Sequence, residues 1–357
     1  MIEVRALTDE LVADAESVIR DRFSEDAVDL LHKEMKNPIR REFPIMGYIG
    51  YEEGKPAAFE AQILRRLYWE KNPIIGSVGG MSCLKKGAAP EVFVDVRIAT
   101  VKPYADCRIW FGNSQNRETA LIAHKSKLAI EGPESCTRYL WRPIRPWNCG
   151  MYFIRRKLLK AAMPRWKNFS TLSSRLWSCE TGGFRIARVA DVDGRFFDAL
   201  MARYVRSNTG IFCSRTAEEI EWIFGEKIRT GEAVVLGTLD NEGPLGYILL
   251  KSDRLAKRWA IHDWFAVDNC LNVLEALLQA ACRFLRAKTP AMMLETFGFP
   301  TGVQSLLRKY LPYVRAVGHN QFSWGSWKMD RKGLCEVLDS PASWFFGPYD
   351  GDACLCM

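Results

Sequence analysis

The pattern of apolar and polar positions predicts one series of strands and helices twice along the chain. The first half predicts strand, helix, helix, hairpin, long strand, helix, strand, helix and strand over residues 2–7, 8–22, 27–35, 47–67, 74–83, 90–101, 107–111, 115–127 and 136–141. The second half repeats this order over residues 184–189, 193–206, 216–227, 233–251, 259–267, 271–287, 292–297, 303–310 and 321–328. Equivalent positions, such as Arg5 and Arg188, lie about 183 to 186 residues apart, as in a duplicated domain. Two unrelated α/β domains of similar length are the alternative.

These elements predict an α/β chain with mixed sheets, in two domains. A length of 357 residues suits two cores better than one. We expect a first domain over 1–145, a basic linker over 146–180, a second domain over 181–330 and an aromatic and acidic tail over 331–357. The linker holds Arg155, Arg156 and Lys157 among apolar residues, which favours a solvated helix. Contact with a membrane surface or an acidic partner is the alternative interpretation.

Composition narrows the class of protein. The chain is 48% hydrophobic and 26% charged, as ordinary globular proteins are, and has no apolar run long enough to cross a membrane. Its N-terminus lacks an export signal, so we expect a cytoplasmic protein with reduced thiols. Neither the eleven cysteines nor the four histidines have metal-ligand spacing, so we expect no metal. The net charge of +8 suits an anionic ligand such as a nucleotide cofactor, whereas the absence of a nucleic-acid motif disfavours DNA.

The residues with the clearest chemical meaning lie between the third strand and the next helix of the first half. There the chain reads Val78-Gly79-Gly80-Met81-Ser82-Cys83-Leu84-Lys85-Lys86-Gly87-Ala88-Ala89-Pro90. Small residues let the backbone approach a ligand, and Pro90 suits a first helical turn. The N–H groups at a helix start attract phosphate, and Lys85 and Lys86 add positive charge. A plain tight turn is the other interpretation of this loop.

The order of elements and this loop together resemble the GNAT superfamily of N-acyltransferases, as a tandem pair covering nearly the whole chain. The family's pyrophosphate loop reads Gln/Arg-x-x-Gly-x-Gly/Ala, which Gly87 and Ala89 match and Leu84 does not. The resemblance implies an acyl-CoA donor, acetyl-CoA or another acyl-CoA, bound by the loop residues Lys85, Lys86, Gly87, Ala88 and Ala89. It also implies that backbone groups of Gly80, Met81 and Ser82 bind the acyl carrier arm.

The family also places an Asn just after the next strand and a Tyr on the following helix. Asn113 and Asn116 are the two matches for the Asn, so the resemblance implies cofactor binding by Asn113 and a catalytic position at Asn116. Ala123 stands where the Tyr belongs, so that general acid is missing. His124 is adjacent but points about 100° away on a helix, and is interpreted as a surface or packing residue.

Acyl transfer to an amine needs a base, because a free alkylamine is protonated at neutral pH. The strand carboxylates that qualify are Glu60 in the first half and Asp263 or Glu295 in the second, and we select Glu60 and Asp263. A structural role is the alternative for each of them. In the second half the segment 260–270 contains no glycine, so we expect that half to hold no donor.

Three functions remain open from the sequence. The first is an N-acyltransferase acting on a small-molecule amine such as an amino sugar or amino acid. The second is an aminoacyl transferase of the FemAB type, although no long helical arm for tRNA is evident, which disfavours tRNA. The third is a binding protein whose sites have decayed. The tail around Asp350 and Asp352 resembles tails of GNAT-like proteins from bacterial polysaccharide loci, and either packs against the body or faces a substrate.

Overall fold

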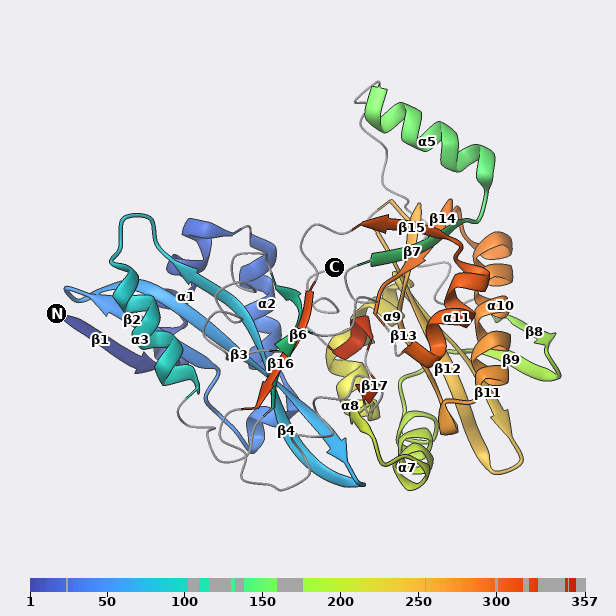
Figure 1. Cartoon of the computed structure of the whole chain (residues 1–357), viewed down its shortest axis with the longest axis horizontal. Coiled ribbons are helices and arrows are strands. Elements are labelled where there is room, and N and C mark those ends of the chain that lie inside the picture. Colours follow the sequence, from blue (N-terminus) through green and yellow to red (C-terminus); the bar gives the residue numbers. More distant parts are fainter. Residues whose placement is uncertain are drawn as a thin grey trace.

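The computed structural model describes residues 1–23, 25–101, 109–115, 130–131, 138–158, 176–253, 255–298, 301–316, 321–326, 344–345 and 347–350. Two sheets lie side by side, each flanked by helices (Figure 1). The first has the strand order β1-β2-β3-β4-β5-β16-β6, with β10 and β17 attached through β3. The second has the order β15-β7-β14-β13-β12-β11-β9-β8.

The first sheet follows the predicted order closely. Its strands from the first half are β1 (Ile2–Ala6), β2 (Gly47–Glu52), β3 (Lys55–Trp69), β4 (Asn72–Leu84), β5 (Ile109–Gln115) and β6 (Ile130–Glu131). The helices α1 (Val12–Arg22), α2 (Glu25–Met35) and α3 (Pro90–Val101) pack on it, with the short 3₁₀ turns η1 (Asp9–Leu11) and η2 (Pro38–Arg41). Along β3, Ala58 packs with α3 and Phe59 packs with α1 residues, so these helices cover opposite faces.

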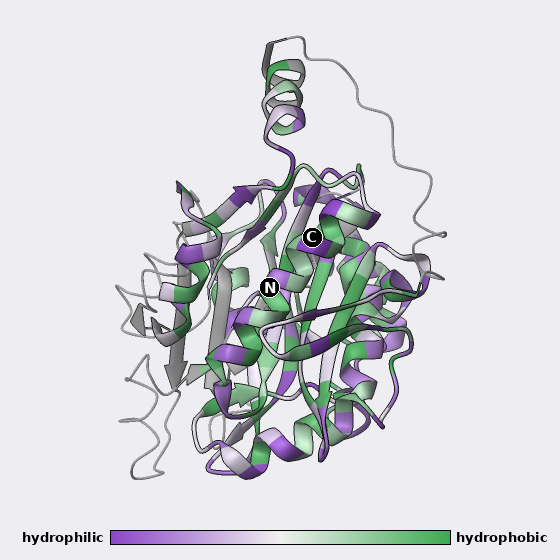
Figure 2. Ribbon diagram, turned by 90° about the vertical axis from the view of Figure 1, so that its right-hand side faces the viewer, coloured by the Kyte–Doolittle hydropathy of each residue, from purple (hydrophilic) through white to green (hydrophobic). Residues whose placement is uncertain are grey.

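The second sheet holds β8 (Ser178–Thr181), β9 (Phe184–Val189), β11 (Ala233–Asp240), β12 (Gly243–Ser252), β13 (Arg258–Ala266), β14 (Met293–Thr296) and β15 (Tyr313–Ala316). Its helices are α7 (Phe197–Ser207), α8 (Ala217–Ile220), α9 (Glu226–Thr230), α10 (Leu271–Lys288) and α11 (Thr301–Tyr310), with a π-helical turn η5 (Glu221–Gly225) and a 3₁₀ turn η6 (Val267–Asn269). The spacing Thr216-x-x-Glu219 predicts a capping box. The structure confirms it, because Thr216 and Glu219 exchange side-chain and backbone hydrogen bonds at the start of α8. Figure 2 shows the apolar strands of the interior and the polar outer surfaces of the helices.

The two halves exchange strands. We expected residues 136–141 and 321–328 to close the sheets of their own halves, and both assignments are wrong. The strand β7 (Arg138–Pro143) lies between β14 and β15 of the second sheet. The strand β16 (Gln321–Ser326) lies between β5 and β6 of the first. The short strands β10 (Ile211–Cys213) and β17 (Trp344–Phe345) also join the first sheet. Each sheet is therefore completed by the other half of the chain.

The described part of the connection between the halves contains the helix α5 (Pro146–Leu158), which follows β7 and projects from the body in Figure 1. Among the described residues, no helix combines the length and apolar character that a membrane span requires.

Candidate functional site

The strand β4 carries a β-bulge at three of the residues selected from the sequence. Phe59 pairs with Cys83 and Ala61 pairs with Gly80, so Glu60 alone lies opposite Met81 and Ser82. Met81 has a φ of 51°, a conformation that L-residues seldom adopt. At Gly80 an added Cβ would lie 2.7 Å from the Ile63 side chain, so close packing explains this glycine. The bulge changes the direction of β4 where the acyl carrier arm was expected.

The strands β4 and β5 separate just before this bulge. They pair in parallel at three positions, and Val78 with Phe111 is the last of them. Beyond Val78, β4 continues to Leu84 and β5 continues to Gln115 without pairing to each other within the described residues. The backbone of β4 over 79–84 therefore has a side that faces away from β3 and is not used by β5. Backbone N–H and C=O groups on such a side are available to an extended ligand.

The loop after β4 turns at Gly87 and leads directly into α3. Gly87 has a φ of 82° with open space around an added Cβ, so its backbone conformation is what requires glycine. The helix α3 then begins at Pro90, as expected. Lys85 N–H donates to Ala57 O at 2.7 Å, which fixes the loop to β3.

Two carboxylates already bind N–H groups of this loop. Lys86 N–H donates to Asp21 Oδ2 at 2.9 Å, and Ala89 N–H donates to Glu52 Oε2 at 3.3 Å. Lys85 Nζ meanwhile donates to Ser17 Oγ at 3.0 Å. The anionic oxygens of Asp21 and Glu52 are stand-ins for phosphate oxygens, so the loop amides point where an anion can accept from them. The sequence analysis missed both residues, because they come from the ends of α1 and β2 and no local spacing connects them to the loop.

Glu60 lies beside the bulge, on the face of the sheet that α3 covers. It is buried, forms an ion pair with Arg97 of α3 and accepts a hydrogen bond from Ser82. Burial raises the pKa of Glu60, while Arg97 and Ser82 act in the opposite direction. One carboxylate oxygen, Oε2, has no hydrogen-bond partner in the described structure. Glu60 therefore combines a raised pKa with an oxygen that is free to accept a proton.

Of the two asparagines that the family resemblance selected, the structure describes Asn113 but not Asn116. We expected Asn113 just after the strand, but β5 extends to Gln115, so Asn113 lies within it. Asn116, Ala123 and His124 lie outside the described residues. The predicted catalytic position at Asn116 stays a prediction.

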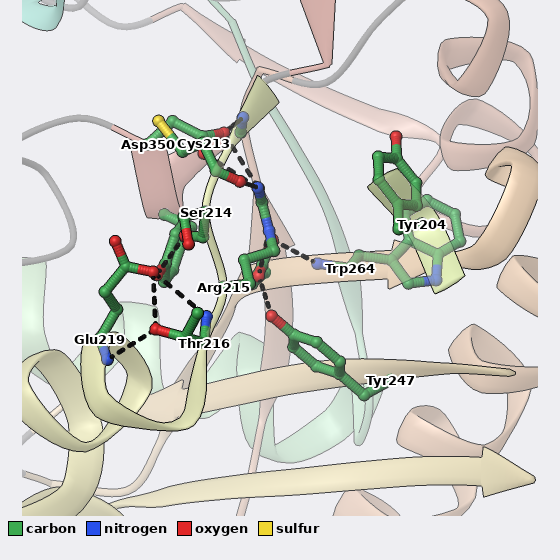
Figure 3. A network of polar contacts seen from close by, with 12 residues as sticks. Tyr204, Cys213, Ser214, Arg215, Thr216, Glu219, Tyr247, Trp264 and Asp350 are labelled. Atoms are coloured by element: carbon green, nitrogen blue, oxygen red, sulfur yellow. Dashed lines mark hydrogen bonds and ion pairs between the residues drawn. The ribbon is translucent and has the colours of Figure 1, made fainter. Parts of the chain in front are cut away.

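Asp263 belongs to the second sheet, whereas Glu60 and the 85–89 loop belong to the first. It lies on β13, fully buried, where it accepts hydrogen bonds from Arg215 Nε at 2.8 Å and Arg215 Nη2 at 3.2 Å. Figure 3 shows the surrounding network with Arg215, Tyr247 and Asp350. Tyr247 Oη and Trp264 N–H donate to the Asp263 carboxylate. Because both oxygens are engaged, we assign Asp263 a structural role and no proton transfer. Glu295 is likewise bound by Arg258 and Arg315.

The second sheet repeats the separation of strands, but its own tail fills the space. β13 pairs in parallel with β14 from Arg258 to Ala260. It then continues to Ala266 paired with β12 but, within the described residues, not with β14. The 3₁₀ turn η8 (Pro348–Asp350) packs against β13, and Asp350 accepts Arg215 Nη2 at 3.0 Å. Arg65 of β3 donates to Tyr349 O at 2.6 Å, which connects the tail to the first sheet. The tail residue Asp350 is therefore packed inside, and Asp352 lies outside the described residues.

Comparison with known proteins gives a consistent picture of the fold. No protein-family model matches the chain, and no curated protein sequence matches it either. Among solved structures, a GCN5-related N-acetyltransferase from Anabaena variabilis matches with 11% identity and a TM-score of 0.57, over 91% of this chain and 72% of that one. A probable N-acyltransferase from Enterococcus faecalis matches with 9% identity and a TM-score of 0.57, over 92% of this chain and 73% of that one.

The N-myristoyltransferase of Saccharomyces cerevisiae, solved with bound myristoyl-CoA, matches with 11% identity and a TM-score of 0.51, over 91% of this chain and 82% of that one. These likenesses span both sheets of the chain. The chain therefore has the fold of the GNAT N-acyltransferases, as the sequence resemblance implied.

Proposed function

We propose that this chain is an N-acyltransferase that moves an acyl group, acetyl in the simplest case, from acyl-CoA to the amine of an amino sugar or an amino acid. The observation that carries the proposal is the continuous path from the unpaired side of β4, through the bulge at Gly80–Ser82, to the N–H groups of the 85–89 loop. This path has extended backbone for a carrier arm at one end and anion-oriented amides at the other.

In this proposal, different residues of the first half bind different parts of acyl-CoA. The amides of Lys86 and Ala89 and the charge of Lys85 would bind the pyrophosphate, as they now bind carboxylates. Backbone groups of Gly80, Met81 and Ser82 would position the acyl carrier arm. A bound acyl-CoA supplies the thioester that reacts. The second half contributes strands and the packed tail, which occupies the space that would be its own donor site.

Glu60 would take the proton from the amine, directly or through water. An alkylamine has a pKa near 10, so the attacking nitrogen must be deprotonated as it reacts. The raised pKa of Glu60 and its free Oε2 suit this role, and general-base catalysis contributes about 10²- to 10⁴-fold in rate. Ser82, which donates to Glu60, would orient the carboxylate beside the bulge.

Calorimetry with acetyl-CoA tests the donor site. Gly87→Glu should abolish binding, because it adds a negative charge and a side chain at a φ of 82°. Gly54→Glu is the matched control, since Gly54 has a φ of 77° and equally open surroundings in the β2–β3 turn. Failure of the unmodified chain to bind acetyl-CoA and longer acyl-CoAs would refute the proposal, and binding that survives Gly87→Glu would move the donor elsewhere.

Thiol release with a panel of amino sugars and amino acids tests the reaction. Glu60→Gln should retain acetyl-CoA binding and lose about 10²-fold or more in kcat. A chain that binds acetyl-CoA but releases no thiol with any amine would support the alternative of a binding protein.

A further inference from the structure

The helix α5 displays a row of apolar side chains to solvent. Trp147, Met151 and Ile154 are 87%, 51% and 46% exposed, although each is large and apolar. Their spacing of four and three residues places them along one side of the helix. Figures 1 and 2 show from two directions that α5 projects beyond the sheets. Solitary exposed apolar residues are common on proteins, but an aligned row that includes a tryptophan is a mark of a contact surface.

The start of α5 is fixed to the body, so this row has a defined direction. Arg145 Nη1 and Nη2 donate to Ala291 O and Arg286 O, each at 2.6 Å. Ile144 N–H donates to Met292 O at 2.7 Å, and Cys149 is buried. The helix is therefore anchored at its first turn on the second sheet and α10, while Trp147, Met151 and Ile154 are exposed among the described residues.

The charge of this part of the chain indicates which kind of partner binds the apolar row of α5. The 45 residues between Glu134 and Glu180 contain ten Lys or Arg and no Asp or Glu. Since the whole chain has a net charge of +8, the rest of it sums to −2. Three of the ten, Arg155, Arg156 and Lys157, form the last turn of α5. The net positive charge of the protein is thus accounted for by the sequence segment that contains this helix.

We propose that α5 is a docking helix for an anionic phospholipid surface, lying in the plane of the headgroups. Apolar side chains with a tryptophan, beside a run of cations, are the combination that holds a helix at a bilayer interface. A nucleic acid would contact the cations but not the apolar row, whereas a bilayer interface accommodates both. The inference does not depend on the proposed acyl transfer.

Co-sedimentation of the full chain with vesicles tests the proposal. Vesicles of phosphatidylcholine containing about one third phosphatidylglycerol should bind the chain, and vesicles of phosphatidylcholine alone should bind it much less. Binding should weaken in about 0.5 M salt, because screening shortens the electrostatic attraction. Equal binding to both vesicles, or no binding to either, would overturn the proposal.

Two sets of substitutions separate the apolar and the charged contributions. Trp147→Gln, Met151→Gln and Ile154→Gln together should weaken binding by roughly tenfold or more, and Leu239→Gln with Val314→Gln, at two other exposed apolar positions, should not.

Arg155→Gln, Arg156→Gln and Lys157→Gln together should weaken binding by about 100-fold at low salt, at about fivefold per cation. The charge-matched control is Arg5→Gln with Arg41→Gln and Arg195→Gln, three exposed arginines elsewhere. If the control weakens binding as much as the α5 set, or if polyglutamate but no vesicle binds the chain, α5 is not a lipid-docking helix.

Discussion

Replacing the two carboxylates that hold the loop amides should strengthen binding of the acyl donor. The double variant Asp21→Asn and Glu52→Gln keeps an oxygen that can accept from Lys86 N–H and Ala89 N–H, and removes two negative charges. In the proposed complex the phosphate oxygens accept from these same N–H groups. The present carboxylates must then move aside and remain as near neighbours of the pyrophosphate, which they repel.

The size of this repulsion follows from Coulomb's law. At a separation of about 5 Å, two unit charges repel by about 0.8 kcal/mol in water and about 3 kcal/mol at an effective dielectric constant of 20. Asp21 is exposed and Glu52 is half-buried, so a value near the lower limit applies, about 1 kcal/mol for each carboxylate. The Kd for acetyl-CoA should therefore fall about fivefold for each substitution and about 30-fold for the pair.

Calorimetric titration at about 0.02 M and about 0.5 M salt measures the effect, which should shrink at the higher salt because of screening. The control is Asp193→Asn with Glu242→Gln, which removes two charges from the second half, where Asp193 also accepts a backbone N–H. If the double variant binds acetyl-CoA no more tightly than the control, the pyrophosphate does not occupy these amides and the reasoning fails.

Three further outcomes are expected, all measured against the unmodified chain. Arg215→Met should lower the free energy of unfolding in urea by about 3 to 5 kcal/mol, because it leaves the buried carboxylates of Asp263 and Asp350 unpaired, whereas Arg195→Met on the surface should change it little. Burial raises the pKa of Asp350 in the folded chain, so the folded state binds more protons than the unfolded one between the two pKa values. The free energy of unfolding should therefore decrease as the pH rises through that interval. Urea titrations at several pH values should show a smaller decrease for Asp350→Asn than for the unmodified chain. Gly50→Val should lower the free energy of unfolding by about 1 to 3 kcal/mol and weaken acetyl-CoA binding. A Cβ at this position would lie 2.5 Å from the Val92 side chain of α3, and the loop amides lie at the start of that helix. Unchanged acetyl-CoA binding would show that the position of α3 does not affect the donor site.

The buried network around Arg215 gives the tail residue Asp350 a structural role. Arg215 lies between the rings of Phe265 and Tyr349, at 4.5 and 4.6 Å, and binds carboxylates from β13 and from η8. The tail residue Asp350 is 135 positions away from Arg215 along the chain. Within the described tail, Tyr349 and Asp350 thus pack against the second sheet through Arg215.

The sequence by itself determined the local features of this protein. The start of α3 at Pro90 and the capping box of Thr216 and Glu219 depend on neighbours within a few residues, and both were predicted. The bulge at Met81 was not predicted, although the residues around it were selected, because a bulge is defined by the partner strand.

Tertiary structure alone decided which strands share a sheet and which charges meet. Alternation of apolar residues shows that β7 and β16 are strands, but any sheet edge offers the same backbone hydrogen bonds, so the pattern cannot tell which sheet receives them. The contacts of Asp21 and Glu52 with the loop, and the burial of Asp263 against Arg215, also join residues far apart in sequence. Such pairings depend on how complete elements pack, and no spacing along the chain encodes them.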